Sequence, residues 1–181
     1  MIFTLLKKKI LFYRVNRSQE AKRAYLRSLG CIVGEGTRFM GKANVGDDPY
    51  LVEIGADCLI SDDVRFYAHD GGVKVLNTAG FFDGEKMDKM ARIKIGNNCF
   101  IGSGTKIMGG VKIGNDVVVG AGSIITRSIP DRVVVAGMPA RIICTLEEYY
   151  SKNLSKGVFF PTPNMAYEDK KKYLADHVPH L

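Results

Sequence analysis

A six-residue period is the feature of this chain that most limits the folds open to it. From Ile95 onwards the chain divides into consecutive hexapeptides, and the first residue of every one is aliphatic. These first residues are Ile95, Ile101, Ile107, Ile113, Val119 and Ile125. The second residue is Gly in four of the six, and the fifth is always small or β-branched. A chance origin has odds of about one in 5,000 for the first position alone.

The same phase recurs upstream, where a shift of three residues at 51–53 separates two groups. Their first positions are Val33, Phe39 and Val45, then Ile54, Ile60 and Phe66. A period of six is not that of an α-helix, but it suits a solenoid in which short parallel strands alternate with turns. Three hexapeptides make one triangular coil. The predicted coils are 33–50, 54–71, 95–112 and 113–130, and 131–141 begins a fifth.

The repeats resemble a known family. The I-G-x-x-[STVC]-x hexapeptides, followed by Val119–Ser123 (VGAGS) and Gly137–Arg141 (GMPAR), are similar to the hexapeptide-repeat acyltransferases. The sugar and polysaccharide O-acetyltransferase branch is the best match, with galactoside, maltose and serine acetyltransferases as relatives, over roughly residues 25–145. The resemblance implies a left-handed parallel β-helix, acetyl-CoA as donor, and a homotrimer with active sites between subunits. We therefore expect an all-β solenoid of about four to five coils with helical N- and C-terminal appendages.

Residues 72–92 interrupt the repeat and predict a long inserted loop. In the family such a loop commonly reaches the neighbouring subunit's site, and Phe81 and Phe82 either cover a site or pack on a coil. Residues 146–181 also leave the repeat and predict helices near Leu146–Lys152 and Tyr167–Ala175. The expected domains are a basic helical segment (1–30), the β-helix (31–145) and a helical extension (146–181).

The net charge of +7 belongs to the first thirty residues, which contain eight Lys or Arg and one Glu. The other 151 residues carry 18 basic and 18 acidic side chains, so the composition does not indicate nucleic-acid binding. Ser18 suits the start of a helix and Gly30 its end. Leu5, Leu6, Ile10 and Phe12 give the segment of residues 1–30 an apolar side. This segment either lies on an anionic membrane surface or, as we prefer, caps the β-helix with its Lys and Arg in solvent.

No apolar run approaches the ~20 residues that span a bilayer, and no signal peptide is recognisable. The expected location is therefore the cytoplasm or the inner membrane surface. The four cysteines, Cys31, Cys58, Cys99 and Cys144, form no C-x-x-C pair. We expect small buried thiols rather than disulfides or zinc ligands, because Cys58 and Cys99 fall at fifth positions of the repeat.

His69 is the only histidine in the repeat region, at the edge of a coil just before the inserted loop. Acyl transfer from a thioester to a hydroxyl needs a base, and a free imidazole, which titrates near ~6.5, can take that proton at neutral pH. A lone histidine is more often structural, but the family match gives His69 the role of catalytic base. His177 and His180 are expected in solvent.

The family match also implies the donor site. Gly120-Ala121 is a small-residue corner, and Ser103 lies one coil earlier in the repeat, on the same edge. By resemblance Ser103 and Ala121 contact the pantetheine arm, while Thr126, Arg127 and Arg141 approach the adenosine phosphates. Arginine suits this task because its planar fork holds phosphate bidentately. The alternative for Ser103, Ala121 and Thr126 is turn geometry alone.

The resemblance to small-sugar acetyltransferases implies that the acceptor binds polar residues of the first coil, which here are Lys42, Asn44, Asp47 and Asp48. Lys42 stands where galactoside-type relatives have an amide, so the identity of their acceptor does not carry over. Asp47 and Asp48 either bind sugar hydroxyls or form a turn. Asp70, the residue after the predicted base, either contacts substrate or orients the loop.

The predicted activity is acetyl-CoA-dependent O-acetylation of a sugar or glycan precursor of capsule, exopolysaccharide or lipopolysaccharide type. N-acetylation of an amino sugar or nucleotide amino sugar, and a non-enzymatic scaffold, remain as alternatives. A γ-type carbonic anhydrase needs three histidine ligands where this chain has one, so no metal is predicted.

Overall fold

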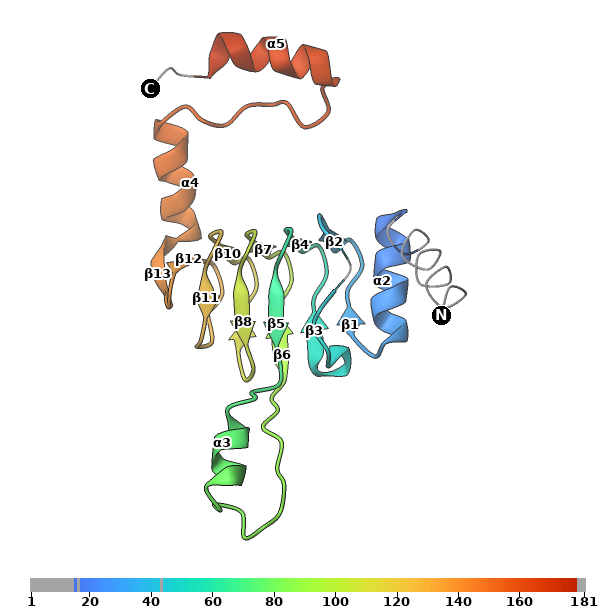
Figure 1. Ribbon diagram of the computed structural model, residues 1–181. Coiled ribbons are helices and arrows are strands. Elements are labelled where there is room, and N and C mark those ends of the chain that lie inside the picture. The colour runs from blue at the N-terminus through green and yellow to red at the C-terminus, as the bar shows by residue number, and fades with distance from the viewer. Residues whose placement is uncertain (1–14, 16, 43, 179–181) are drawn as a thin grey trace.

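The computed structural model describes residues 15, 17–42 and 44–178. Between residues 32 and 137 the chain passes in turn through three sheets of parallel strands (Figure 1). The first sheet contains β1 (Ile32–Val33), β3 (Val52–Ile54), β6 (Ile93–Ile95) and β9 (Lys112–Ile113). The second contains β2 (Arg38–Phe39), β4 (Leu59–Ile60), β7 (Phe100–Ile101), β10 (Val118–Val119), β12 (Val133–Gly137) and β13 (Ala140–Thr145). The third contains β5 (Arg65–Tyr67), β8 (Lys106–Met108) and β11 (Ile124–Ile125).

Strand register follows the sequence repeat. Ile95 pairs with Ile113, and Ile101 pairs with Val119 in the second sheet, so each partner lies one full coil of three hexapeptides further along the chain. Upstream, Val33 pairs with Ile54, and this coil is longer by the three residues of the phase shift. The register is kept despite these three extra residues because the chain makes a 3-10 helix, η1 (Pro49–Leu51), before it enters β3. The predicted frame and its phase shift are therefore confirmed.

The aliphatic first positions form the core of the solenoid. Seven of them are each at most 3% exposed, as an inward-facing ladder requires: Ile54, Ile60, Ile95, Ile101, Ile107, Ile113 and Val119. The fifth positions also point inward, including polar Thr105 and Ser123. Their hydroxyls donate to the carbonyls of Gly102 (2.7 Å) and Gly120 (2.6 Å), so these buried polar atoms are satisfied.

The corner between the first and second sheets explains why Asn or Asp occurs at the fourth position of the repeat and Gly at the second. Asp57, Asn98 and Asp116 stack there with φ of 56°, 52° and 55°, the left-handed region that Asn and Asp tolerate best after Gly. At the second position of the repeat, a Cβ on Gly96 would lie 2.5 Å from the carbonyl oxygen of Gly114. Glycine is needed because successive coils approach this closely.

Helix α2 (Gln19–Ser28) caps the N-terminal end of the solenoid against β1 and β2. It begins as predicted, because the Ser18 side chain accepts a hydrogen bond from the Ala21 N–H, and Gly30 follows its end with φ of 87°. The Nζ of Lys22 donates to the carbonyls of Phe39 and Gly41, both at 2.7 Å.

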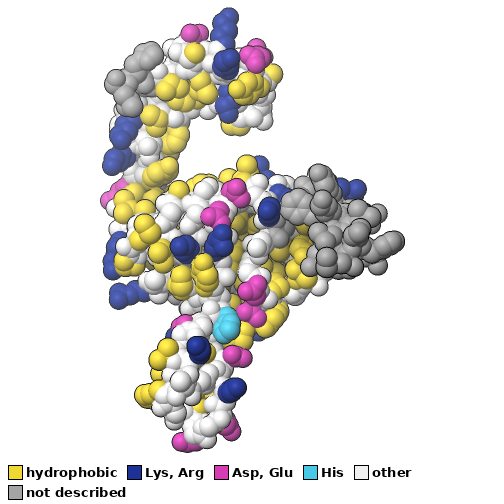
Figure 2. All heavy atoms as spheres, in the orientation of Figure 1, with side chains coloured by type: hydrophobic (Ala, Val, Ile, Leu, Met, Phe, Trp, Pro, Cys, Tyr) yellow, Lys and Arg dark blue, Asp and Glu magenta, His cyan; other side chains and the backbone are white. Residues whose placement is uncertain are grey.

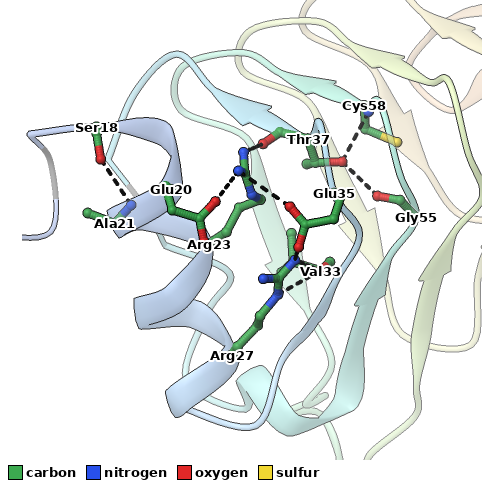
Figure 3. A network of polar contacts seen from close by, with 10 residues as sticks. All are labelled: Ser18, Glu20, Ala21, Arg23, Arg27, Val33, Glu35, Thr37, Gly55 and Cys58. Carbon is green, nitrogen blue, oxygen red and sulfur yellow. Dashed lines mark hydrogen bonds and ion pairs between the residues drawn. The ribbon is translucent and has the colours of Figure 1, made fainter.

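The prediction that the Lys and Arg side chains of this cap lie in solvent is wrong for three of them, Lys22, Arg23 and Arg27, whereas Arg17 is exposed. Lys22 is only 7% exposed, Arg23 donates to the carbonyl of Thr37, and Arg27 donates to that of Val33 (Figure 3). The physical reason is the open end of the first coil, because no strand among the described residues precedes β1 and offers N–H donors to these carbonyls. The apolar residues Leu5, Leu6, Ile10 and Phe12 lie outside the described residues.

Lys22 provides a test of this cap. Its replacement by Met keeps most of the side-chain volume but removes a charged donor from two carbonyls, so we expect the free energy of unfolding to fall by about 1.5–3 kcal/mol. Urea unfolding measures the change. Lys171→Met, on an exposed surface of the C-terminal extension, is the control and should be neutral. Equal stability of Lys22→Met and the native chain would contradict this role.

At the other end the chain leaves the repeat through a hairpin. β13 returns antiparallel to β12, and helices α4 (Leu146–Ser155) and α5 (Tyr167–His177) follow. Both predicted C-terminal helices are confirmed, and each continues two or three residues beyond its expected end. Figure 1 shows α4 rising from the last coil and α5 standing apart from the sheets. Within the described residues, no helix is both long and apolar enough to cross a membrane.

Candidate active site

His69 lies in a short antiparallel stem at the base of the inserted loop. The Ala91 N–H donates to the Ala68 carbonyl and the Asp70 N–H to the Lys89 carbonyl, both at 2.8 Å, and His69 faces Met90. The loop contains α3 (Val73–Thr78) and extends away from the sheets (Figure 1). The stem therefore anchors His69 where the last strand of its coil, β5, ends.

The imidazole of His69 is open to solvent, with 47% of the side chain exposed. In Figure 2 a histidine (cyan) is visible on the surface where the loop joins the body. The Nε2 atom lies 3.8 Å from Oδ1 of Asp88. Sequence reasoning missed Asp88, because it lies at the far end of the inserted loop, in a segment without repeat character.

Asp70 is tied to the loop rather than to His69. Its carboxylate accepts hydrogen bonds from Lys89 Nζ (2.6 Å) and from the Gly72 N–H (2.9 Å). These two hydrogen bonds, with that from Lys89 contributing most, lower the pKa of Asp70. Of the two roles considered for Asp70, these contacts are those of a residue that orients the loop. Phe81 is 70% exposed, so it does not pack on a coil of its own chain.

The residues assigned to the donor fall into two groups. Ser103 and Ala121 occupy the same corner on adjacent coils, where the Gly122 N–H donates to the Ser103 carbonyl at 2.7 Å. Both are exposed, just before the third-sheet strands β8 and β11. Thr126 and Arg127 are exposed at the opposite end of β11. His69 follows β5, so it shares their end of the third sheet.

Arg141, the remaining donor residue, is exposed on β13 of the second sheet. Its Nη1 donates to the Ala140 carbonyl at 3.0 Å. A single chain therefore does not gather the predicted donor residues into one pocket. It divides them between the two edges of the third sheet and the terminal hairpin.

The acceptor residues lie where the first coil lacks a strand. No described residue of 40–48 is in a strand, because Gly46 has φ of 91° and its N–H donates to Oδ1 of Asn44 in a tight turn. A cavity of ≈ 580 Å³ occupies this place, and its lining includes Lys42, Asn44 and Asp47. Asp48 does not line it, and its Oδ1 instead accepts a hydrogen bond from the Tyr50 hydroxyl at 2.8 Å.

The cysteines are free thiols, and three of them are inside the solenoid. Cys31, Cys58 and Cys99 are 1–3% exposed, and Cys144 is half-buried. Burial raises the pKa of Cys31 to about 12. In the part of the chain that the structure describes, no group of three or more His, Cys, Asp and Glu residues is arranged to hold a metal ion.

The three-sheeted solenoid, its hexapeptide core and the exposed histidine beside an inserted loop define the hexapeptide-repeat transferase class. Residues 92–127 match the bacterial transferase hexapeptide (six repeats) family. The chain belongs to this family of transferases. It is 41% identical over 151 residues to Protein CapG of Staphylococcus aureus, covering 82% of this chain and 84% of that relative.

Among solved structures, two of serine acetyltransferase from Brucella abortus strain S19 are similar to this chain, one of them in complex with coenzyme A. Each matches with a TM-score of 0.50 and 26% identity over 64% of this chain. This chain spans 40% of the length of those serine acetyltransferases. The similarity therefore leaves more than half of each of those chains unmatched.

Proposed function

We propose that this enzyme transfers an acetyl group from acetyl-CoA to a hydroxyl of a sugar or glycan precursor of capsule, exopolysaccharide or lipopolysaccharide type, with His69 as general base. The observation that carries the proposal is the exposed imidazole of His69, the only histidine between residues 1 and 176. The transfer is direct. An imidazole nitrogen takes the hydroxyl proton, the oxygen attacks the thioester carbonyl carbon, the C–S bond breaks, and the imidazolium returns the proton to the thiolate.

The buried thiols support direct transfer over an acetyl-cysteine intermediate. A cysteine nucleophile has to be a thiolate within reach of its substrate. Cys31, Cys58 and Cys99 are enclosed by the coils, and burial keeps Cys31 protonated by raising its pKa to about 12. Asp88, 3.8 Å from the His69 imidazole, would stabilise the imidazolium formed during the reaction.

The donor assignment rests on the two exposed corners. Ser103 and Ala121 would contact the pantetheine arm, and Thr126, Arg127 and Arg141 would hold the adenosine phosphates. A serine acetyltransferase of similar fold is known in complex with coenzyme A, which supports the same donor here. No metal enters the proposed reaction.

A site assembled between subunits follows from the separation of these residues. Ser103 and Ala121 precede the third-sheet strands, whereas His69 follows one, so a strand's length separates the two corners within one chain. We infer a homotrimer in which a corner of one copy faces His69 of another. The inserted loop 72–92 would then reach the neighbouring copy's site.

The handedness of the solenoid, its number of coils and the domain limits are inferred together with the proposed function. We infer that the coils wind left-handed and number four to five, with 31–145 as the catalytic domain between appendages at 1–30 and 146–181. Left-handed coils are an exception to the usual right-handed crossover between parallel strands. We infer a cytoplasmic location for the reaction, where acetyl-CoA is available.

A thiol-release assay tests the proposal. The whole enzyme is incubated with acetyl-CoA and neutral sugars, amino sugars or their uridine diphosphate esters, and free CoA is followed continuously. We expect CoA release that depends on a hydroxyl acceptor. Release only with an amino sugar, and loss of its free amine, would instead establish N-acetylation. No release with any acceptor would favour the scaffold.

Arg127 and Arg141 test the donor site. Their phosphate contacts would be the same in the ground and transition states, so Arg127→Ala or Arg141→Ala should raise the KM for acetyl-CoA with little change in kcat. Loss of a charged hydrogen bond, worth about 1.5–3 kcal/mol, corresponds to roughly 10- to 100-fold in KM. Acetyl-pantetheine, which lacks these phosphates, should be used equally by the variants and the native enzyme. A native enzyme that binds acetyl-CoA and acetyl-pantetheine equally well would contradict the assignment.

A further inference from the structure

The inserted loop (72–92) encloses very little apolar surface of its own. It extends away from the sheets (Figure 1), and Phe81 near its tip is 70% exposed. In its helix α3 only Val73 is buried, while Asn77, one turn further on, is half-buried. Because so little apolar surface is enclosed, the conformation of the loop depends on its hydrogen bonds rather than on packing.

Asn77 connects α3 to the returning segment of the loop. Its Nδ2 donates to the Met87 carbonyl at 2.8 Å, and its Oδ1 accepts a hydrogen bond from the Met87 N–H at 2.9 Å. A carboxamide carries a donor and an acceptor side by side, so it satisfies both backbone groups of one residue, as a neighbouring strand does. This pair of hydrogen bonds, the Asn77–Met87 clamp, fixes the residue that precedes Asp88.

The residue on the other side of Asp88 is fixed as well. The Lys89 carbonyl accepts from the Asp70 N–H at 2.8 Å, and Lys89 Nζ donates to the Asp70 carboxylate at 2.6 Å. Asp88 therefore lies between one residue held by α3 and another held by the segment that carries His69. Its Oδ1 is 3.8 Å from Nε2 of His69. With both neighbours held, the backbone of Asp88 has little freedom to move away from the imidazole.

From these contacts we propose that Asn77 is a positioning residue that holds Asp88 against the catalytic imidazole of its own copy. A carboxylate fixed before the reaction stabilises the imidazolium without having to be brought into place at each turnover. Since the imidazolium forms only as the hydroxyl proton is transferred, this contribution appears in kcat and not in the KM of either substrate. The inference rests on the proposed function and adds to it a residue that acts through Asp88.

The clamp also divides the loop into two parts with different tasks. Asn77 and Met87 close the stem, so the residues before Asn77 and after Met87 stay with the His69 of the same copy. The tip, residues 78–86, lies beyond this closure and includes the exposed Phe81. The tip is therefore available to contact a neighbouring copy, as the inferred homotrimer requires.

The test compares Asn77→Ala, Asp88→Asn and the double variant with the native enzyme. Asn153→Ala is the matched control, because Asn153 is also half-buried and its Nδ2 donates to a backbone carbonyl, that of Tyr149 at 2.7 Å, but it lies on α4. Release of CoA from acetyl-CoA, with the best acceptor among neutral sugars, amino sugars and their uridine diphosphate esters, gives kcat and both KM values. Hydrogen exchange at the Met87 N–H, followed by mass spectrometry, reports on the clamp, and thermal unfolding reports on the solenoid.

We expect Asp88→Asn to lower kcat about fivefold, the factor that an exposed ion pair supplies, and Asn77→Ala to lower it about threefold, because the stem still holds Lys89. The double variant should be no slower than Asp88→Asn alone, because Asn77 acts through Asp88. Both KM values should stay within about twofold of the native values. The Met87 N–H should exchange about tenfold faster in Asn77→Ala, with an unchanged Tm. Asn153→Ala should keep the native kcat.

Three results would overturn this inference while the transferase function stands. The first is a native kcat in Asn77→Ala although exchange at Met87 has become faster. The second is a double variant whose loss of kcat is the product of the two single losses, as for residues that act independently. The third is unchanged exchange at Met87, which would show that the clamp does not hold the loop. If no acceptor leads to release of CoA by the native enzyme, the proposed transfer itself fails, and the role of Asn77 with it.

Discussion

The His69→Ala enzyme is expected to turn over about 10²- to 10⁴-fold more slowly than the native enzyme, with little change in its affinity for acetyl-CoA. The reason is chemical. An alcohol is a poor nucleophile until its proton is removed, and the 47% exposed imidazole of His69 is the base available at neutral pH. Initial rates of CoA release, measured at saturating acetyl-CoA, give the change in kcat.

The pH profile separates a base from a merely structural histidine. For the native enzyme, kcat/KM should rise with pH through one ionisation near neutrality, as expected for a catalytic imidazole. His69→Asn should abolish this inflection without altering the fold. His177→Ala, at an exposed histidine stacked on Tyr173 in α5, serves as the control and should keep it. Native turnover by His69→Ala, or accumulation of an acetylated cysteine, would refute direct transfer by a histidine base.

Ile107→Asp should prevent the domain from folding. Ile107 is fully buried, between Phe66 and Ile125 of the adjacent coils, and neither the stacked strands nor the aliphatic ladder offers a partner for a carboxylate. An unpaired buried charge costs several kcal/mol, a large part of the ~5–15 kcal/mol that stabilises an ordinary domain. Circular dichroism and size-exclusion chromatography at 25 °C would then report an unfolded or aggregated chain.

Lys106→Asp is the matched control for this prediction. Lys106 lies next to Ile107 on β8 but is exposed, so the same substitution introduces the same carboxylate on the opposite face of the strand. We expect this variant to fold and to unfold in urea at a concentration close to that of the native chain. A folded Ile107→Asp protein would show that the inward ladder is not what holds the coils together.

The repeat could be predicted from the sequence because the residue types within each hexapeptide specify its local structure. An aliphatic residue at the first position must point inward, and Gly at the second is needed where two coils approach closely, as at Gly96. The three-residue shift at 51–53 was visible for the same reason. The helix start at Ser18 was equally local, since an N-cap bonds to a backbone N–H three residues along the chain.

Contacts between segments that are distant in the sequence could not be predicted from the sequence. Asp88 and Lys89 come back to His69 and Asp70 only because the inserted loop closes on its own stem, and nothing in the repeat specifies how that loop folds. The burial of Lys22 was missed because charge alone favours solvent, whereas the open end of the first coil offers carbonyls that need a donor.

By itself, then, the sequence determined the period, the aliphatic first positions and the positions of the interruptions, because all of these depend on side-chain type and spacing along the chain. The role of His69 as base came from the resemblance to the family. The tertiary structure alone decided which residues share an edge of the third sheet, what closes the open first coil, and where a cavity forms. These depend on how segments such as α2, the stretch 40–47 and the corner 61–65 meet in space. The contacts between these segments depend on hydrogen-bond satisfaction and packing across coils, and these cannot be predicted from a local sequence pattern.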